Sequence, residues 1–109
     1  MTTTPDATSR RLAHLLGLAR HALADAHRQA SAGLLQPKQR LLILDALHRP
    51  DGGDGGLLHL LGDLITDTSR DLPEGDAAEQ LDEAASYASD YPAQRIDRAR
   101  TALAAPTGP

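Results

Sequence analysis

A chain of 109 residues is long enough for one domain with a modest core, and its formal net charge of -4 argues against broad affinity for nucleic acid or an anionic membrane. It contains no cysteine, which excludes disulfides, thiolate catalysis and cysteine-ligated zinc. Leu and Ala supply most of the apolar residues while Val, Phe and Trp are absent, so the composition predicts an all-α fold, a four- to five-helix bundle-like single domain.

The first predicted helix follows a polar N-terminus. Residues 1–7 are expected to be a disordered tail, and the helical domain is expected to span residues 8–105. Residues 8–31 carry apolar side chains three and four positions apart, which is typical of an amphipathic helix. Because no hydrophobic signal region or long apolar run is found, we expect a cytoplasmic protein.

The second and third helices are predicted over residues 37–49 and 56–69. Pro37 suits the first turn of a helix, where a missing N–H group costs nothing. Leucines point almost all round residues 37–49, so this helix is expected to be the buried centre of the fold. On that expectation, Leu44→Ala or Leu47→Ala should each cost about 2–5 kcal/mol.

Two Ala-rich helices are predicted over residues 76–90 and 92–104, followed by a frayed tail at 106–109. Asp76 and Glu79 have the spacing of a capping box at the first of them. Alanine buries little apolar area, so these helices are expected to find the missing area on a partner or a second copy. The large apolar residues predicted to form that interface are Leu81, Tyr87, Tyr91, Ile96 and Leu103.

Acidic and basic residues are separated along this last third of the chain. Six acidic residues precede a cluster of three arginines, and the two groups are complementary within one chain or across a dimer. The acidic group is Asp71, Glu74, Asp76, Glu79, Asp82 and Glu83; the basic group is Arg95, Arg98 and Arg100.

The stretch between the second and third helices is rich in glycine and aspartate. Residues 51–56 are interpreted as a mobile joint, and no metal ligand, catalytic residue or cofactor is assigned. A metal site remains an alternative because imidazole and carboxylate together suit zinc, nickel or manganese. Its ligands would be His48, Asp51, Asp54, His59 and Asp63, and a second histidine pair, His14 and His21, shares one face of the first helix.

Residues 10–53 resemble the opening half of MarR-type transcriptional regulators. That resemblance implies a helix-turn-helix reading of residues 57–72, with a recognition helix near Thr66–Asp71 and a β-hairpin wing after it. The sequence departs from the family there, because Asp67 and Asp71 would face phosphate and nothing after Leu72 favours a strand. The residues that carry the resemblance are Gly33, Leu34, Pro37, Gln39, Leu42 and Leu47.

The predicted function follows from these features. No serine lies in a catalytic motif such as G-x-S-x-G, and the carboxylates fall on helix first turns or exposed faces. We therefore expect a small non-enzymatic regulatory or accessory protein, without a cofactor, that acts through self-association or contact with another protein. A DNA-binding regulator, a small metal-binding protein and an enzyme stay open as alternatives.

Overall fold

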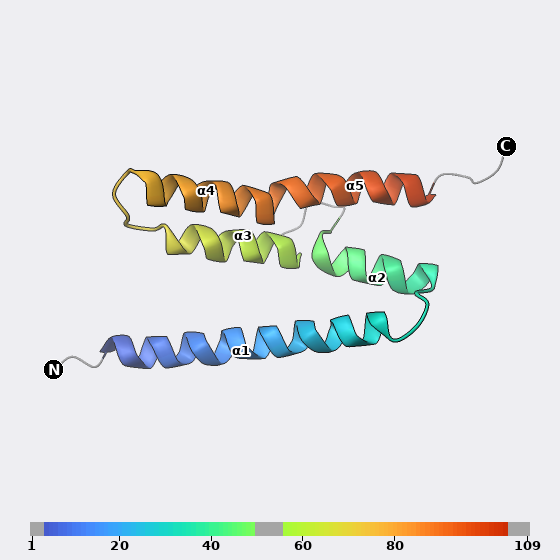
Figure 1. Cartoon of the computed structure of the whole chain (residues 1–109), viewed down its shortest axis with the longest axis horizontal. Helices are drawn as coiled ribbons and strands as arrows, with labels where there is room; N and C mark the ends of the chain where they lie inside the picture. The colour runs from blue at the N-terminus through green and yellow to red at the C-terminus, as the bar shows by residue number, and fades with distance from the viewer. Residues whose placement is uncertain (1–3, 50–55, 105–109) are drawn as a thin grey trace. The chain divides into compact units, whose positions relative to one another are not determined.

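The computed structural model describes residues 4–49 and 56–104. All the described secondary structure is helical, which confirms the predicted all-α class (Figure 1). Contacts between residues divide the chain into two units, Met1–Gln36 and Pro37–Pro109. Within the described ranges, no helix is long and apolar enough to cross a membrane. The described residues form five helices: α1 (Thr4–Ser31), α2 (Pro37–Leu47), α3 (Leu57–Thr68), α4 (Asp76–Ala88) and α5 (Asp90–Ala104).

The first unit is built on α1, a single helix of 28 residues. It begins at Thr4, inside the segment predicted as a tail, and ends where the Ala32 amide donates to the Gln29 carbonyl at 3.3 Å. Its polar face carries an exposed ion pair between Arg28 and Asp25. The apolar stripe predicted from the spacing of leucines and alanines therefore lies along one continuous helix.

The second unit holds the other four helices. Helix α3 lies beside α4, and α5 continues α4 almost in line, with α2 beside α5 (Figure 1). Gly62 of α3 is buried, and a β-carbon added there would lie 2.7 Å from the Ser89 β-carbon. At this point only a hydrogen atom fits between the backbone of α3 and the C-cap of α4, so the two helices pack closely there.

The centre of this unit is α3, and the prediction that residues 37–49 form the buried centre was wrong. Helix α3 contacts α2, α4 and α5, whereas α2 contains no buried residue, and Leu42 of α2 is 70 % exposed. A leucine-rich surface shows that a helix is apolar, but not that neighbours cover every side. The side of α3 that faces α4 contains Gly62, which lies there beside the polar residues His59 and Asp63.

Truncation of the α2 leucines is therefore expected to cost less than full burial would imply. Leu44 and Leu47 are both half-buried. We expect Leu44→Ala and Leu47→Ala each to lower the free energy of unfolding by about 1–2 kcal/mol, since part of each side chain is already in water. Urea denaturation followed by circular dichroism measures this. A loss above about 4 kcal/mol for either variant would show that α2 is fully enclosed.

The connection between α3 and α4 uses two residues with positive φ. Asp71 has a φ of 67°, a left-handed conformation that Asp tolerates, and Gly75 has a φ of 156°, which suits glycine. Gly75 is the N-cap of α4 and provides no side-chain cap, so the predicted capping box between Asp76 and Glu79 was wrong. Instead, Asp76 is the first helical residue, and its carboxylate accepts a hydrogen bond from Gln80 at 3.4 Å.

The glycine-rich joint predicted at residues 51–56 lies outside the described residues except for Gly56. Gly56 is buried, and a β-carbon there would lie 2.7 Å from the Leu47 carbonyl oxygen. Its own carbonyl accepts the first hydrogen bond of α3, from Leu60 at 3.1 Å. The start of α3 is therefore packed directly against the end of α2.

Candidate interaction surface

An uninterrupted row of residues follows the outer side of α4 and α5, turned away from α3. Its members are four residues apart, so each lies next to the one before it on the helix surface, and the row winds slowly round the helix by about 40° per step. Two backbone hydrogen bonds meet at Ser89, at the junction of the two helices: Ser89 donates to Ala85, and Ala93 donates to Ser89, both at 3.0 Å. We call these residues the tyrosine row: Glu79, Glu83, Tyr87, Tyr91 and Arg95.

The two aromatic rings of the tyrosine row form a contact with each other. The ring centroids of Tyr87 and Tyr91 lie 6.2 Å apart with an interplanar angle of 81°, an edge-to-face arrangement. The Arg95 guanidinium carbon lies 5.2 Å from the Tyr91 ring centroid, and Arg95 Nη2 donates to the Tyr91 hydroxyl at 3.0 Å. Tyr87 and Tyr91 are 64 % and 52 % exposed, so this ordered aromatic group faces solvent.

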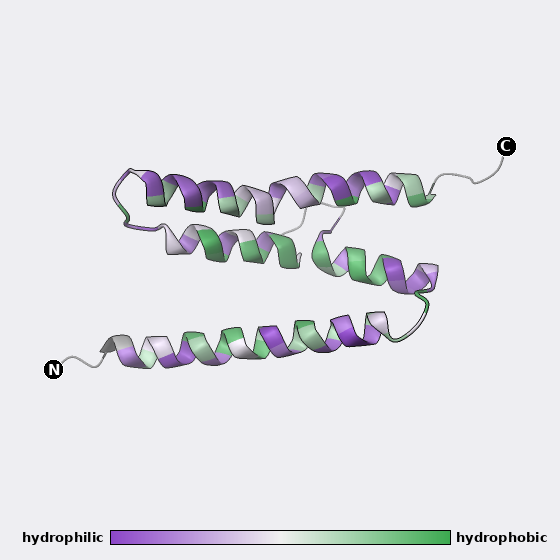
Figure 2. Cartoon of the chain, viewed as in Figure 1, coloured by the Kyte–Doolittle hydropathy of each residue, from purple (hydrophilic) through white to green (hydrophobic). Residues whose placement is uncertain are grey.

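The inner side of α4 faces α3, and this explains the outward direction of the tyrosines. Ala85 and Ser89 of α4 lie around Gly62. Tyr87 is two residues from each of them, about 200° round the helix from Ala85 and from Ser89. Figure 2 shows hydrophilic residues along the side of α4 turned away from α3.

The five residues predicted to form an interface lie in three different environments. Tyr87 and Tyr91 point outward, whereas Leu81 and Ile96 are half-buried. Leu103 is half-exposed beside a hollow of about 230 Å³ between α2 and the end of α5. The sequence could not separate these environments, because all five residues are large and apolar in an alanine-rich stretch. Residues lining the hollow are Pro37, Arg40, Leu41, Leu103 and Ala104.

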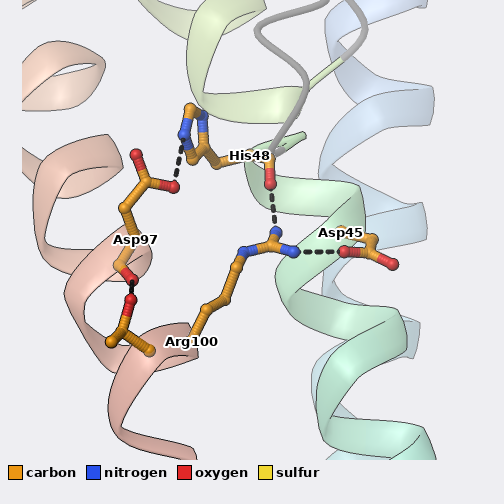
Figure 3. Close-up of polar contacts among 5 residues, drawn as sticks. Asp45, His48, Asp97 and Arg100 are labelled. Carbon is orange, nitrogen blue, oxygen red and sulfur yellow. Dashed lines mark hydrogen bonds and ion pairs between the residues drawn. The ribbon is translucent and has the colours of Figure 1, made fainter. Parts of the chain in front are cut away.

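A polar network joins α2 to α5 (Figure 3). Arg100 Nη1 donates to Asp45 Oδ1 at 2.5 Å, and Arg100 Nη2 donates to the His48 carbonyl oxygen. His48 Nε2 lies 3.1 Å from Asp97 Oδ1. The Arg100 side chain is only 16 % exposed, and its Nε is buried without a hydrogen-bond partner among the described residues. Arg100 therefore binds the end of α2 within the chain.

The three arginines of the predicted basic cluster therefore lie in three different environments. Arg100 is engaged with α2, and Arg95 lies on the Tyr91 ring. Arg98 is exposed on α5. One sequence signal distinguishes Arg100 from the other two arginines. It lies four residues after Ile96, on the half-buried side of α5, where a guanidinium fully surrounded by water is not expected.

A shallow polar groove of about 330 Å³ lies between α3 and α4 and reaches the start of α5. Within it, His59 Nε2 lies 3.3 Å from Asp63 Oδ2. Among the described residues, no group of three or more histidines and carboxylates is placed to hold a metal ion. Of the residues in the metal alternative, His48 and His59 contact different carboxylates, and Asp51 and Asp54 lie outside the described ranges. The groove is lined by His59, Gly62, Asp63, Thr66, Asp82, Ala85, Ser86, Ser89 and Asp90.

The helix-turn-helix reading of residues 57–72 requires a turn that the structure does not contain. Helix α3 runs without a break from Leu57 to Thr68, through Gly62, where the turn would stand. The segment proposed as a recognition helix instead contains the end of α3 and its cap at Ser69. The part of the chain that the structure describes also contains no strand that could form a wing.

Among the described residues, the geometry therefore offers an exposed aromatic surface, the tyrosine row, and a shallow polar groove. Both belong to the unit that begins at Pro37. Comparison with models of protein families, with curated proteins and with solved structures finds no match for this chain.

Proposed function

We propose that this chain is a small non-enzymatic regulatory or accessory protein that acts through protein–protein contacts, including contacts with its own copies. The observation that supports this most is the exposed Tyr87–Tyr91 pair with Arg95 stacked at its end. Tyr and Arg are the residue types most often found at the energetic centres of protein interfaces. Here their rings are already ordered, so little side-chain entropy is lost when a partner covers them.

The composition of α4 and α5 supports the same proposal. Neither helix contains a buried residue, and alanines fill most of the positions on their apolar sides. Ordering about 28 residues costs roughly 1–2 kcal/mol each for the backbone alone. A second copy that covers the tyrosine row would add apolar burial at about 25 cal/mol per Å², which offsets part of that cost.

Self-association is the measurable consequence. We expect the protein to form dimers at micromolar concentration, and Tyr91→Ala to raise the dissociation constant about tenfold or more, as loss of an interface anchor does. Sedimentation equilibrium or light scattering over a concentration series measures both quantities. Leu103→Ala, made separately and together with Tyr91→Ala, shows whether the hollow beside α2 takes part as well.

The control is His14→Ala, an exposed change on the polar face of α1, which should leave the dissociation constant unchanged. A strictly monomeric mass up to high micromolar concentration would contradict self-association. Equal dissociation constants for the wild type and Tyr91→Ala would show that the tyrosine row is not the contact.

A further inference from the structure

Along the outer side of α4 and α5, the charge changes from negative before the two tyrosines to positive after them. Glu79 and Glu83 precede Tyr87, and Arg95 follows Tyr91, all of them exposed. Glu83 lies four residues before the first tyrosine, and Arg95 lies four residues after the second. About the midpoint of the two tyrosines, Glu83 and Arg95 are therefore equally distant and opposite in charge, whereas Glu79 has no basic counterpart.

We propose that the tyrosine row is a two-fold interface on which a second copy of this chain docks antiparallel, so that Glu83 of each copy meets Arg95 of the other. This inference rests on the self-association proposed above and specifies its symmetry and register. A two-fold axis midway between Tyr87 and Tyr91 exchanges the halves of the row. It brings Tyr87 of one copy opposite Tyr91 of the other.

The helix geometry agrees with this register. At a rise of about 1.5 Å per residue, Glu83 and Arg95 each lie about 9 Å along the helix axis from the midpoint of the row. An antiparallel copy therefore places the carboxylate and the guanidinium at the same height. Residues four apart also form the ridges that pack into grooves in the commonest class of helix crossing. A parallel copy would instead oppose acid to acid and base to base, which is repulsive.

A second copy fits this surface because Glu83 and Arg95 are complementary about its centre. The inner side of α4 is occupied by α3, and Arg100 binds α5 to α2, whereas the outer side of α4 and α5 is exposed. Arg95 is held by its contact with the Tyr91 ring and hydroxyl, and a guanidinium keeps further N–H donors for a carboxylate. A self-complementary patch of this kind is what a two-fold dimer requires.

Charge reversal in the full-length chain tests the register. Glu83→Arg and Arg95→Glu should each raise the dimer dissociation constant about tenfold or more, because like charges then meet twice across the two-fold axis. The double variant Glu83→Arg/Arg95→Glu should recover most of the wild-type affinity, since opposite charges face each other again. Far-UV circular dichroism of each variant confirms that helix content is kept.

Mixing the two single variants gives an independent readout. In the mixture, each copy with two arginines at positions 83 and 95 meets a copy with two glutamates, so a heterodimer should form more tightly than either variant alone. The matched control is Asp82→Arg, which changes the charge of the neighbouring residue on the groove side of α4 and should leave the dissociation constant within about twofold.

The outcomes separate this inference from the proposal it rests on. A dimer that resists both single reversals, or a double variant as weak as the single ones, overturns the antiparallel register while self-association stands. A mixture that gives no heterodimer also overturns it. A wild-type chain that is monomeric throughout the concentration series overturns both proposals.

Discussion

Replacing Gly62 with alanine is expected to lower the free energy of unfolding by about 1–3 kcal/mol. The added β-carbon would lie 2.7 Å from the Ser89 β-carbon and 3.4 Å from the Ala85 carbonyl oxygen. Because the Ser89 β-carbon is bonded directly to the backbone, it cannot rotate away, and α3 and α4 must move apart. The lost packing outweighs the roughly 0.5–1 kcal/mol that alanine gains over glycine in a helix. Urea denaturation gives the value.

Gly17→Ala is the matched control for that prediction. Gly17 also lies inside a helix, and a β-carbon added there meets nothing within 4 Å. Its replacement should leave the free energy of unfolding unchanged or raise it by up to about 1 kcal/mol. If Gly62→Ala proves as stable as Gly17→Ala, α3 and α4 do not approach as closely as the structure shows.

Arg100→Ala is the second substitution with a large expected effect, a loss of about 1–3 kcal/mol in the free energy of unfolding. The change removes the donors to Asp45 and to the His48 carbonyl, and also the packing of a side chain that is 84 % covered. The Asp45 side chain is 59 % exposed, so water replaces part of that ion pair, and the expected cost stays below that of a fully buried pair.

Arg98→Ala provides the comparison, since Arg98 lies two residues away on the same helix but is exposed. It should change the free energy of unfolding by less than about 0.5 kcal/mol. Arg100→Lys should recover only part of the lost stability, because a lysine ammonium lacks the rigid fork of N–H donors with which a guanidinium bonds a carboxylate and a carbonyl together. Equal stabilities for Arg98→Ala and Arg100→Ala would show that the α2–α5 network does not stabilise the unit.

The class of the fold and the existence of each helix could be predicted from simple signals. The absence of Val, Phe and Trp indicated an all-α chain, and Pro37 marked the first residue of α2. The predictions that were wrong concern the N-cap of α4 and the burial of α2, which depend on neighbouring parts of the structure. Asp76 is an equally good residue for an N-cap or for a first turn, and the hydrogen bond from the Glu79 amide to the Gly75 carbonyl makes Gly75 the N-cap instead. Burial of α2 failed for the same reason, since periodicity describes one helix and not what covers it.

The candidate surface was predictable in composition but not in arrangement. The four-residue spacing of Tyr87 and Tyr91 is enough to predict that the two rings are neighbours on a helix. Their outward direction depends on Gly62, which selects the side of α4 that faces α3. The role of Arg100 depends on a contact between residues 55 positions apart, which no local pattern encodes. Both features follow from tertiary packing, and the sequence carries one indirect signal for each: the glycine inside a leucine-rich helix, and the position of Arg100 four residues after Ile96.

The order of packing along the chain has a consequence for folding kinetics. Helix α3 pairs with α4 across a short connection, and α4 continues into α5, so most of these contacts are between sequence neighbours. Low contact order of this kind is associated with folding in microseconds to milliseconds. The α2–α5 network instead closes a long loop around Arg100 and is expected to form last and open first. Amide protons near the end of α5 should then exchange with deuterated solvent sooner than those at the α3–α4 contact.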